Sequence, residues 1–194
     1  MTDLIWSLSP WLVFLLSARF TSFPAALALG FVASVVVLAR AATGHRAHML
    51  DVASLCYFAT LAVVLAITYP AHIESWSRYA QLGSHLVLTL LIFGSIVVGR
   101  PFTQSYAKKT TPPELWRTPG FRDVNRRISG VWGLAFLAGD VSLALAASVD
   151  ARQVLLRVIV PFGALYLAYR YTVNQQAQVR AAQPDPKVHS TRPI

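Results

Sequence analysis

Long apolar runs alternate with short polar segments along this chain of 194 residues. A helix needs about 20 apolar residues to cross a bilayer, and about 17 are tolerated. Six runs approach or reach this length, over residues 4–18, 23–38, 50–69, 80–99, 129–148 and 154–171. The first two are short and close together, so we expect them to form a tilted hairpin. The pattern predicts an all-α fold, a polytopic membrane bundle of about six transmembrane helices.

The distribution of Lys and Arg predicts the orientation of this bundle. If the N-terminus lies inside, only four of the 17 basic residues fall on outer segments, namely Arg19, Arg78, Arg152 and Arg157. An excess of basic residues on the inner side is what the positive-inside rule requires. The rule is satisfied here by an even number of spans, so we expect both termini inside. Five spans with a partly interfacial first segment are the alternative.

The composition also indicates a membrane protein rather than a soluble one. Hydrophobic residues make up 55% of the chain and charged residues only 13%, against about 25% charged in soluble domains. The net charge of +9 comes from basic residues between the apolar runs. There they set orientation and contact anionic lipid, so we expect no nucleic-acid partner. The lone Cys56 lies in an apolar run, which excludes a disulfide framework and a thiolate metal site.

Residues 100–130 form a basic loop between the fourth and fifth predicted spans, on the inner side. Its cations are Arg100, Lys108, Lys109, Arg117, Arg122, Arg126 and Arg127. Thr111 to Glu114 has the form of a capping box, which predicts a short helix through Trp116 that Pro119 and Gly120 end. A second helix is expected from Phe121 into the fifth span. We expect this loop at the inner headgroup level, where it contacts anionic lipid or a partner; an ordinary basic connector is the alternative.

The same loop carries a recognisable order of motifs. Arg100-Pro101-Phe102 is followed by Lys108-Lys109, then by Pro113-Glu114-Leu115-Trp116, and Asn125 stands at the head of the next span. This order resembles the intracellular septation protein A family of small bacterial inner-membrane proteins, and Ser9-Pro10-Trp11 resembles that family's N-terminal opening. The resemblance implies a multi-pass protein of the inner membrane with a role in cell-envelope maintenance or septation during cell division. Partners would be divisome or envelope-synthesis membrane proteins. The family-motif positions are Pro101, Pro113, Trp116 and Asn125, and no catalytic residue is transferred.

One carboxylate lies well inside a predicted span and requires an explanation. Asp140 is in the fifth span, and a charge near the bilayer centre costs at least about 2.5–3.5 kcal/mol. His85 in the fourth span and Arg157 in the sixth fall in the same outer third of the membrane. We therefore predict an intramembrane polar cluster in which Asp140 pairs with Arg157 or His85. Such a cluster would pin helix packing, bind a solute or relay protons.

Other polar residues have simpler interpretations. His45 and His48 lack a nearby acidic third ligand, so they are expected to be an exposed loop pair rather than a metal site. Asp51 starts the third span and is interpreted as a helix N-terminal charge. Small residues spaced four apart, Gly30/Ser34 and Ala135/Gly139, predict close approach of helices.

These observations predict a transmembrane bundle over residues 1–173 and a disordered cytoplasmic tail over residues 174–194. No nucleophile–base order and no phosphate-binding glycine loop is present, so we expect neither an enzyme nor a cofactor. The leading hypothesis is an envelope scaffold that interacts with lipid or protein partners. The alternative is a small-solute or proton-coupled transporter or channel that uses Asp140, with a homo-oligomer left open.

Overall fold

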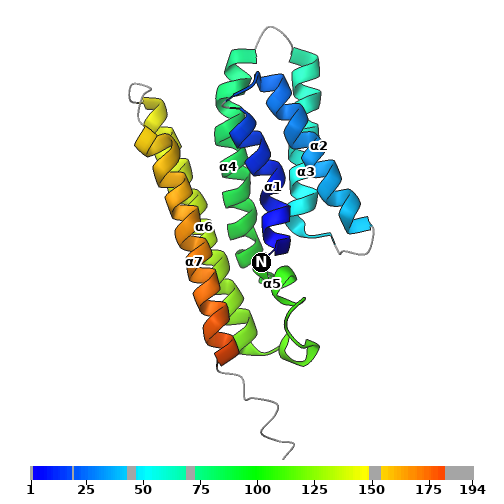
Figure 1. Cartoon of the computed structure of the whole chain (residues 1–194), viewed down its shortest axis with the longest axis vertical. Coiled ribbons are helices and arrows are strands. Elements are labelled where there is room, and N and C mark those ends of the chain that lie inside the picture. The colour runs from blue at the N-terminus through cyan, green and yellow to red at the C-terminus, as the bar shows by residue number, and fades with distance from the viewer. Residues whose placement is uncertain (1, 19, 43–46, 69–72, 149–153, 182–194) are drawn as a thin grey trace, which may run out of the picture.

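The computed structural model describes residues 2–18, 20–42, 47–68, 73–148 and 154–181. Within these ranges the chain forms helices and no strand, which confirms the all-α prediction (Figure 1). The long helices are α1 (Thr2–Ser17), α2 (Phe23–Ala42), α3 (Met49–Thr68), α4 (Ile73–Val97), α6 (Pro119–Ser148) and α7 (Val160–Ala181). Three short elements connect them, namely α5 (Thr103–Ala107), the 3₁₀ turn η1 (Pro113–Leu115) and the π-helical turn η2 (Leu155–Ile159).

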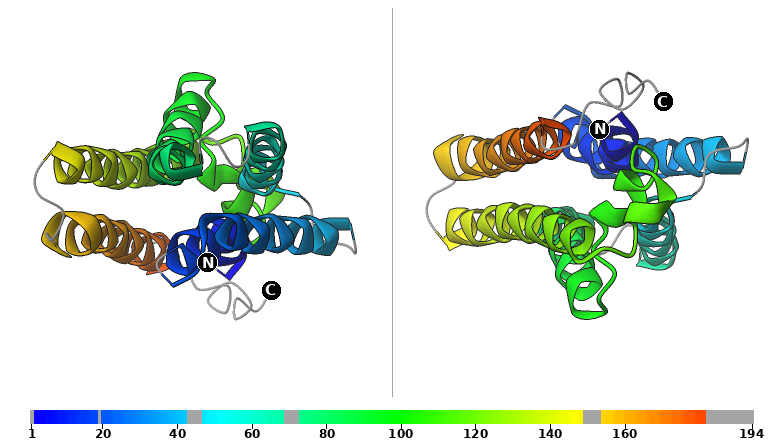
Figure 2. Two further views of the ribbon diagram at one scale, coloured as in Figure 1. Left: turned by 90° about the horizontal axis from the view of Figure 1, so that it is seen from above. Right: turned by 90° about the horizontal axis from the view of Figure 1, so that it is seen from below.

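The helices form two packed groups. α1, α2 and α3 contact one another in the first group, while α6 packs against both α4 and α7 in the second. The groups are joined where α3 meets α4, and where the segment after α4 contacts the first group through Tyr106 on His48 and Lys109 on Asp3 (Figure 2). The long helices alternate in direction, so the start of α1 and the end of α7 face the same end of the bundle (Figure 1).

Apolar side chains hold the first group together around a small residue. Trp11 and Phe14 of α1 are fully buried against Phe58 of α3, with ring centroids 5.4 Å apart in both pairs. Gly30 of α2 lies so close that an added Cβ would be 2.8 Å from the Phe58 ring. The close approach predicted at Gly30 is therefore confirmed, because only a residue without a side chain fits there.

Among the residues that the structure describes, three helices have the length and apolar character needed to cross a membrane. They lie at Phe23–Ala41, Met49–Thr68 and Pro119–Ala146, and two shorter apolar helices lie at Asp3–Ser17 and Leu82–Val97. Large apolar side chains such as Val63, Leu90 and Leu134 are exposed on the outer surface. A soluble protein rarely exposes so much apolar surface, whereas lipid covers it favourably. The fold is that of a helical membrane protein, and the count of six spans stays a prediction.

The basic loop differs from the prediction in how its helices begin. η1 is a single turn without a side-chain cap, so the capping box at Thr111 is wrong. Pro113 disfavours a helical conformation at the preceding Pro112, which is extended (φ −55°, ψ 143°), and the turn therefore starts one residue too late for Thr111 to cap it. Pro119 does not end a helix but begins α6, where the Thr118 hydroxyl accepts a hydrogen bond of 3.4 Å from the Phe121 amide. The second helix expected from Phe121 is confirmed to within two residues.

The C-terminal boundary of the bundle also requires correction. α7 continues to Ala181, so residues 174–181 are helical rather than part of a disordered tail, and the remainder of that predicted tail lies outside the described residues. The reason is packing against α6, which the sequence did not show. The first turns of α6 extend beyond its apolar segment, and Trp132 of α6 donates from Nε1 to the buried Thr172 hydroxyl at 3.0 Å. α7 therefore keeps a packing surface beyond its apolar stretch.

Candidate functional site

Asp140, the centre of the predicted polar cluster, is hydrogen-bonded, but to neither of its predicted partners. Asp140 of α6 accepts a hydrogen bond of 2.6 Å from the Thr89 hydroxyl of α4. It makes no ion pair with Arg157 and no hydrogen bond with His85. The guanidinium of Arg157 instead donates to the Ala146 carbonyl at 3.0 Å, near the end of α6. A neutral donor on the facing helix thus replaces the expected cation.

His85 lies beside this pair without bonding to it. An added Cβ on Gly139 would be 3.2 Å from His85 Nδ1, so the absence of a side chain at Gly139 makes room for the imidazole. The ring also contacts Phe136 edge to face, with centroids 6.0 Å apart. His85 Nδ1 and Asp140 Oδ1 are both buried without a hydrogen-bond partner. The cluster therefore ties α4 to α6 and retains hydrogen-bonding capacity that no described residue uses.

An apolar groove runs along the outer side of the same region. It has a volume of about 470 Å³ and is lined on α6 by Leu134, Leu137, Ala138, Val141, Ser142 and Leu145, and across from it by Leu156 and Val160. The Ser142 hydroxyl donates to the Leu156 carbonyl at 2.7 Å, which satisfies one carbonyl of the π-helical turn. Asp140 does not line this groove.

The basic segment, residues 100–130, is folded onto the bundle rather than free. The Phe102 amide donates to the Ser95 hydroxyl at 3.0 Å, and the Thr103 hydroxyl donates to the Asn125 carbonyl at 2.9 Å. The Asn125 side chain is buried and donates to the Phe121 carbonyl at 2.8 Å. The bonds of Phe102 and Thr103 fix the start of the segment to α4 and α6, and the side-chain bond of Asn125 lies within α6.

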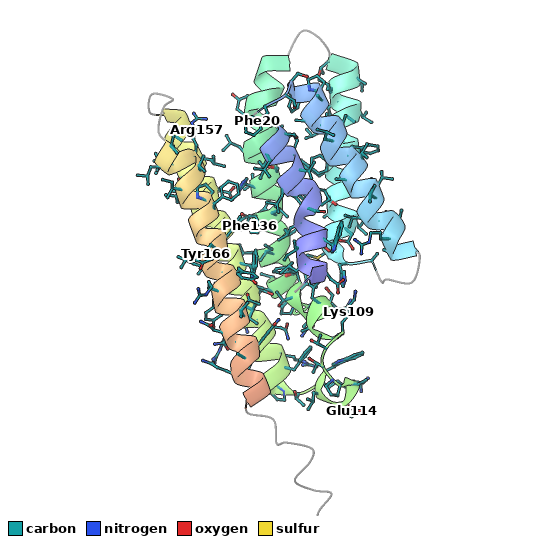
Figure 3. The ribbon with its side chains drawn as sticks, viewed as in Figure 1. Phe20, Lys109, Glu114, Phe136, Arg157 and Tyr166 are labelled. Carbon is teal, nitrogen blue, oxygen red and sulfur yellow. The ribbon has the colours of Figure 1, made fainter. Side chains whose placement is uncertain are left out.

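The family-motif positions have different environments. Pro101 and Asn125 are buried, Pro113 is exposed, and Trp116 is half-buried with its Nε1 donating to the Thr111 carbonyl at 2.9 Å. Lys108 Nζ lies 5.3 Å above the Trp116 ring. The predicted lipid-contact cations are all exposed: Arg100, Lys108, Lys109, Arg117, Arg122, Arg126 and Arg127. Glu114 is also exposed on this segment, near its outer edge (Figure 3).

A second polar cluster, which sequence reasoning missed, lies where α1, α3 and α5 meet. His48 is only 6% exposed, so the prediction of an exposed loop histidine is wrong for this residue, while His45 lies outside the described residues. The His48 ring stacks on Tyr106 of α5, with centroids 4.1 Å apart and planes inclined by 21°. Its Nδ1 lies 3.1 Å from the Ser105 hydroxyl. The stacking explains the burial, because α5 covers a histidine that the connecting segment alone would expose.

The tautomer of neutral His48 follows from the hydrogen bond that its neighbour Ser105 makes. When the Ser105 hydroxyl donates its single hydrogen to the Phe102 carbonyl at 2.9 Å, it accepts from His48 Nδ1–H. His48 Nε2 is then an acceptor, and it is buried without a partner. Burial lowers the pKa of His48 below its usual 6.5, against the opposing effect of Asp51. Burial likewise raises the pKa of Tyr106, whose hydroxyl lies beside Ser7 but makes no hydrogen bond of ordinary geometry.

Asp51 has the predicted role at the start of α3 and one further feature. Its Oδ2 accepts the His48 amide at 2.8 Å, which satisfies a free N–H at the helix start. Asp51 is only 3% exposed, and its Oδ1 has no hydrogen-bond partner. Nearby, Lys109 Nζ forms an ion pair of 3.0 Å with Asp3 Oδ2, which joins the basic segment to α1 (Figure 3). Such partly exposed pairs contribute about 0–1 kcal/mol.

A pocket of about 30 Å³ opens between these residues, and α1, α2, α3 and Lys109 line it. The only hint in the sequence was that Asp3 and Asp51 both stand at predicted helix starts on the same side of the bundle. Among the described residues, no three His, Cys, Asp or Glu side chains are arranged to hold a metal ion.

Comparison of the chain with models of protein families, with curated proteins and with solved structures gives no match in any of the three.

Proposed function

We propose that this chain is a multi-pass protein of the bacterial inner membrane, with six spans and both ends inside, that serves as a scaffold in cell-envelope maintenance or division. The observation that carries the proposal is the folded basic segment, residues 100–130. The Thr103 hydroxyl bonds the start of the segment to Asn125 of α6, whose side chain bonds within α6. All seven cations of the segment are exposed. The resemblance of its motifs to the septation protein A family supports the envelope role.

The basic segment suits a surface of anionic headgroups. Each Lys or Arg near an anionic membrane surface contributes about 1 kcal/mol, and the attraction weakens with salt. Because hydrogen bonds hold the start of α5 against α4 and α6, and the first turns of α6 are helical, the cations on these two elements require little ordering on binding. The same surface would bind acidic segments of divisome or envelope-synthesis membrane proteins.

A charge-neutralising variant tests the lipid contact. Arg117, Arg122, Arg126 and Arg127 are exchanged together for Gln in the full chain, and binding of phosphatidylglycerol is measured in mild detergent at low and high salt. We expect at least about tenfold weaker binding at low salt and a smaller salt dependence. The matched control exchanges the same four residues for Lys, which keeps the charge. Equal binding by the Gln variant and the parent protein would refute the lipid contact.

The envelope role needs a cellular test. Deletion of the gene in its own bacterium should lengthen cells or delay septum formation. The parent protein and the Lys variant should restore normal length, whereas the Gln variant should not. Normal division and envelope integrity in the deletion strain would contradict this part of the proposal.

Transport through the Asp140 cluster is the second candidate. It is favoured by the buried atoms Asp140 Oδ1 and His85 Nδ1, which have no hydrogen-bond partner on facing helices. Proteoliposomes loaded with a pH-sensitive dye should then show proton movement that Asp140→Asn abolishes. Identical dye responses with the parent protein, Asp140→Asn and empty liposomes would exclude this function.

A further inference from the structure

The pocket where α1 and α3 begin and α2 ends is lined by two buried side chains that carry hydrogen-bond acceptors without a described donor. His48 and Asp51 line it, and both side chains are more than nine-tenths buried. His48 Nε2 and Asp51 Oδ1 have no hydrogen-bond partner. Buried acceptors left in this state cost about 1–3 kcal/mol each. An occupant that donates at least two hydrogen bonds would remove this cost.

The Asp51 carboxylate favours a cation over a neutral donor in the pocket. Asp51 is a buried carboxylate whose only described bond comes from the His48 amide, and it forms no ion pair with any described residue. The other carboxylate of the pocket, Asp3, is already paired with Lys109. A buried carboxylate without a cation is unfavourable, so a positively charged donor satisfies this site better than water does.

Size restricts the cation. A pocket of about 30 Å³ accommodates a group about as large as one or two water molecules. A primary ammonium group, –NH₃⁺, has this size and three donors. A trimethylammonium group is several times larger and has no N–H donor. The pocket is therefore large enough for the ammonium group of ethanolamine and too small for the trimethylammonium group of choline.

The position of the pocket indicates where such an ammonium comes from. The pocket lies where the apolar helices α1 and α3 begin and α2 ends. These three helix ends face the same way (Figure 1). If each helix crosses the membrane, as proposed, this is the level of lipid headgroups. Two exposed cations line its rim, Lys109 and Arg40, and the Arg40 guanidinium lies 3.9 Å above the Trp6 ring. An acceptor-lined interior with a basic rim matches a zwitterion whose ammonium enters first and whose phosphate stays outside.

We propose that this pocket binds the primary ammonium group of an ethanolamine phospholipid headgroup. The phosphate of the same headgroup lies against Lys109 and Arg40 at the rim. The inference uses the membrane placement of the helices but depends neither on a role in septation nor on the cations of residues 117–127.

The test compares lipids that differ only at the headgroup nitrogen. The purified full chain is titrated in mild detergent with dioleoyl phosphatidylethanolamine and with its mono-, di- and trimethylated forms, and bound lipid is counted by native mass spectrometry. We expect binding to weaken with each methyl group and to be at least about tenfold weaker for the choline lipid. Equal binding of the ethanolamine and choline lipids would mean that the pocket holds only water, and would overturn the proposal.

Two variants test the residues. Asp51→Asn keeps an oxygen for the His48 amide but presents an NH₂ donor to the ammonium, so ethanolamine lipid should bind at least about tenfold more weakly while the helix start is preserved. Ala41→Leu should fill the pocket and have the same effect. Asp123→Asn, at an exposed carboxylate on α6, is the matched control and should bind like the parent protein. Unchanged affinity in both pocket variants would refute the site.

Two further arms separate this site from its alternatives. Methylammonium chloride, compared with sodium chloride at equal ionic strength, carries the same ammonium group but neither the phosphate nor the acyl chains, so it should compete only weakly with the lipid. Binding of methylammonium as tight as that of the lipid would show that the site takes a soluble amine and would overturn the assignment to lipid. Phosphatidylglycerol binding should be unchanged in Asp51→Asn, because that lipid depends on the exposed cations of the basic segment. Loss of both lipids in this variant would contradict a separate pocket.

Discussion

Asp140 is half-buried and His48 is buried, and different neighbours stabilise these two polar residues. Asp140 accepts the Thr89 hydroxyl across a helix–helix contact inside the bundle. His48 lies at the bundle end, where Tyr106 covers its ring and Ser105 accepts its Nδ1–H. In both cases the partner is a neutral side chain on another element. Neither partner carries a charge or a spacing that marks it in the sequence.

The Asp140–Thr89 pair predicts an order of stabilities. Thr89→Val should destabilise the protein by about 1 kcal/mol, because it leaves the half-buried Asp140 carboxyl without its donor. Asp140→Leu should cost less, since the Thr89 hydroxyl can turn to a backbone carbonyl of its own helix. Thermal unfolding in detergent, analysed as a double-mutant cycle, measures the coupling. Additive effects of the two substitutions would show that the bond contributes nothing.

The buried imidazole predicts a dependence of stability on pH. Because burial lowers the pKa of folded His48 below 6.5, the unfolded chain binds more protons as the pH falls through this value. The stability from neutral His48 is therefore fully present above about pH 6.5 and is lost progressively at lower pH. His48→Gln should unfold with a weaker pH dependence between pH 7 and 5. Identical pH profiles for the two proteins would contradict this.

At the scale of the elements, local sequence decides where helices exist and distant contacts decide where they end. α6 starts at Pro119 because proline suits the first helical position and the Thr118 hydroxyl caps the turn. α7 extends to Ala181 because α6 lies alongside it and Trp132 binds Thr172. Glycines set the spacing between helices, as Gly30 does for α2 and α3 and Gly139 for α4 and α6.

The close contact at Gly30 predicts a difference between two glycine substitutions. In Gly30→Ala the new Cβ would be 2.8 Å from Phe58 and 3.1 Å from Phe14, so we expect a loss of about 1–3 kcal/mol. Gly94→Ala is the matched control, because no atom lies within 4 Å of its added Cβ and alanine favours the helix. Thermal unfolding of both variants checks this. Equal melting temperatures for the two variants would mean that α2 and α3 can move apart without loss of stability.

At the scale of the whole molecule, the two helix groups place polar chemistry at different depths. The Asp140 cluster lies within the α4–α6–α7 group, and the pocket beside His48 lies at one end of the α1–α2–α3 group. The basic segment connects the groups and contributes Lys109 to the pocket. Lipid bound at that end would therefore contact both the pocket and the exposed cations.

The alternating direction of the long helices predicts a topology. If each crosses the membrane, both chain ends and the basic segment lie inside, as the positive-inside rule also requires. Reporter fusions at the N-terminus and after residue 194 should both report the cytoplasm. A third fusion, after Gly120, should do the same. Ends on opposite sides of the membrane would exclude six spans and favour five.

The sequence by itself determined the helical class, the positions of the long helices to within a few residues at most ends, and the exposure of the basic segment. These follow from hydropathy and charge, which act locally and need only the fixed thickness of a bilayer. Tertiary structure alone decided that Asp140 pairs with Thr89, that His48 is buried under α5, and that α7 extends past residue 173. Those outcomes depend on which side chains meet across helices. The rotation of each helix and its register against its neighbour decide this, and no local sequence pattern determines either.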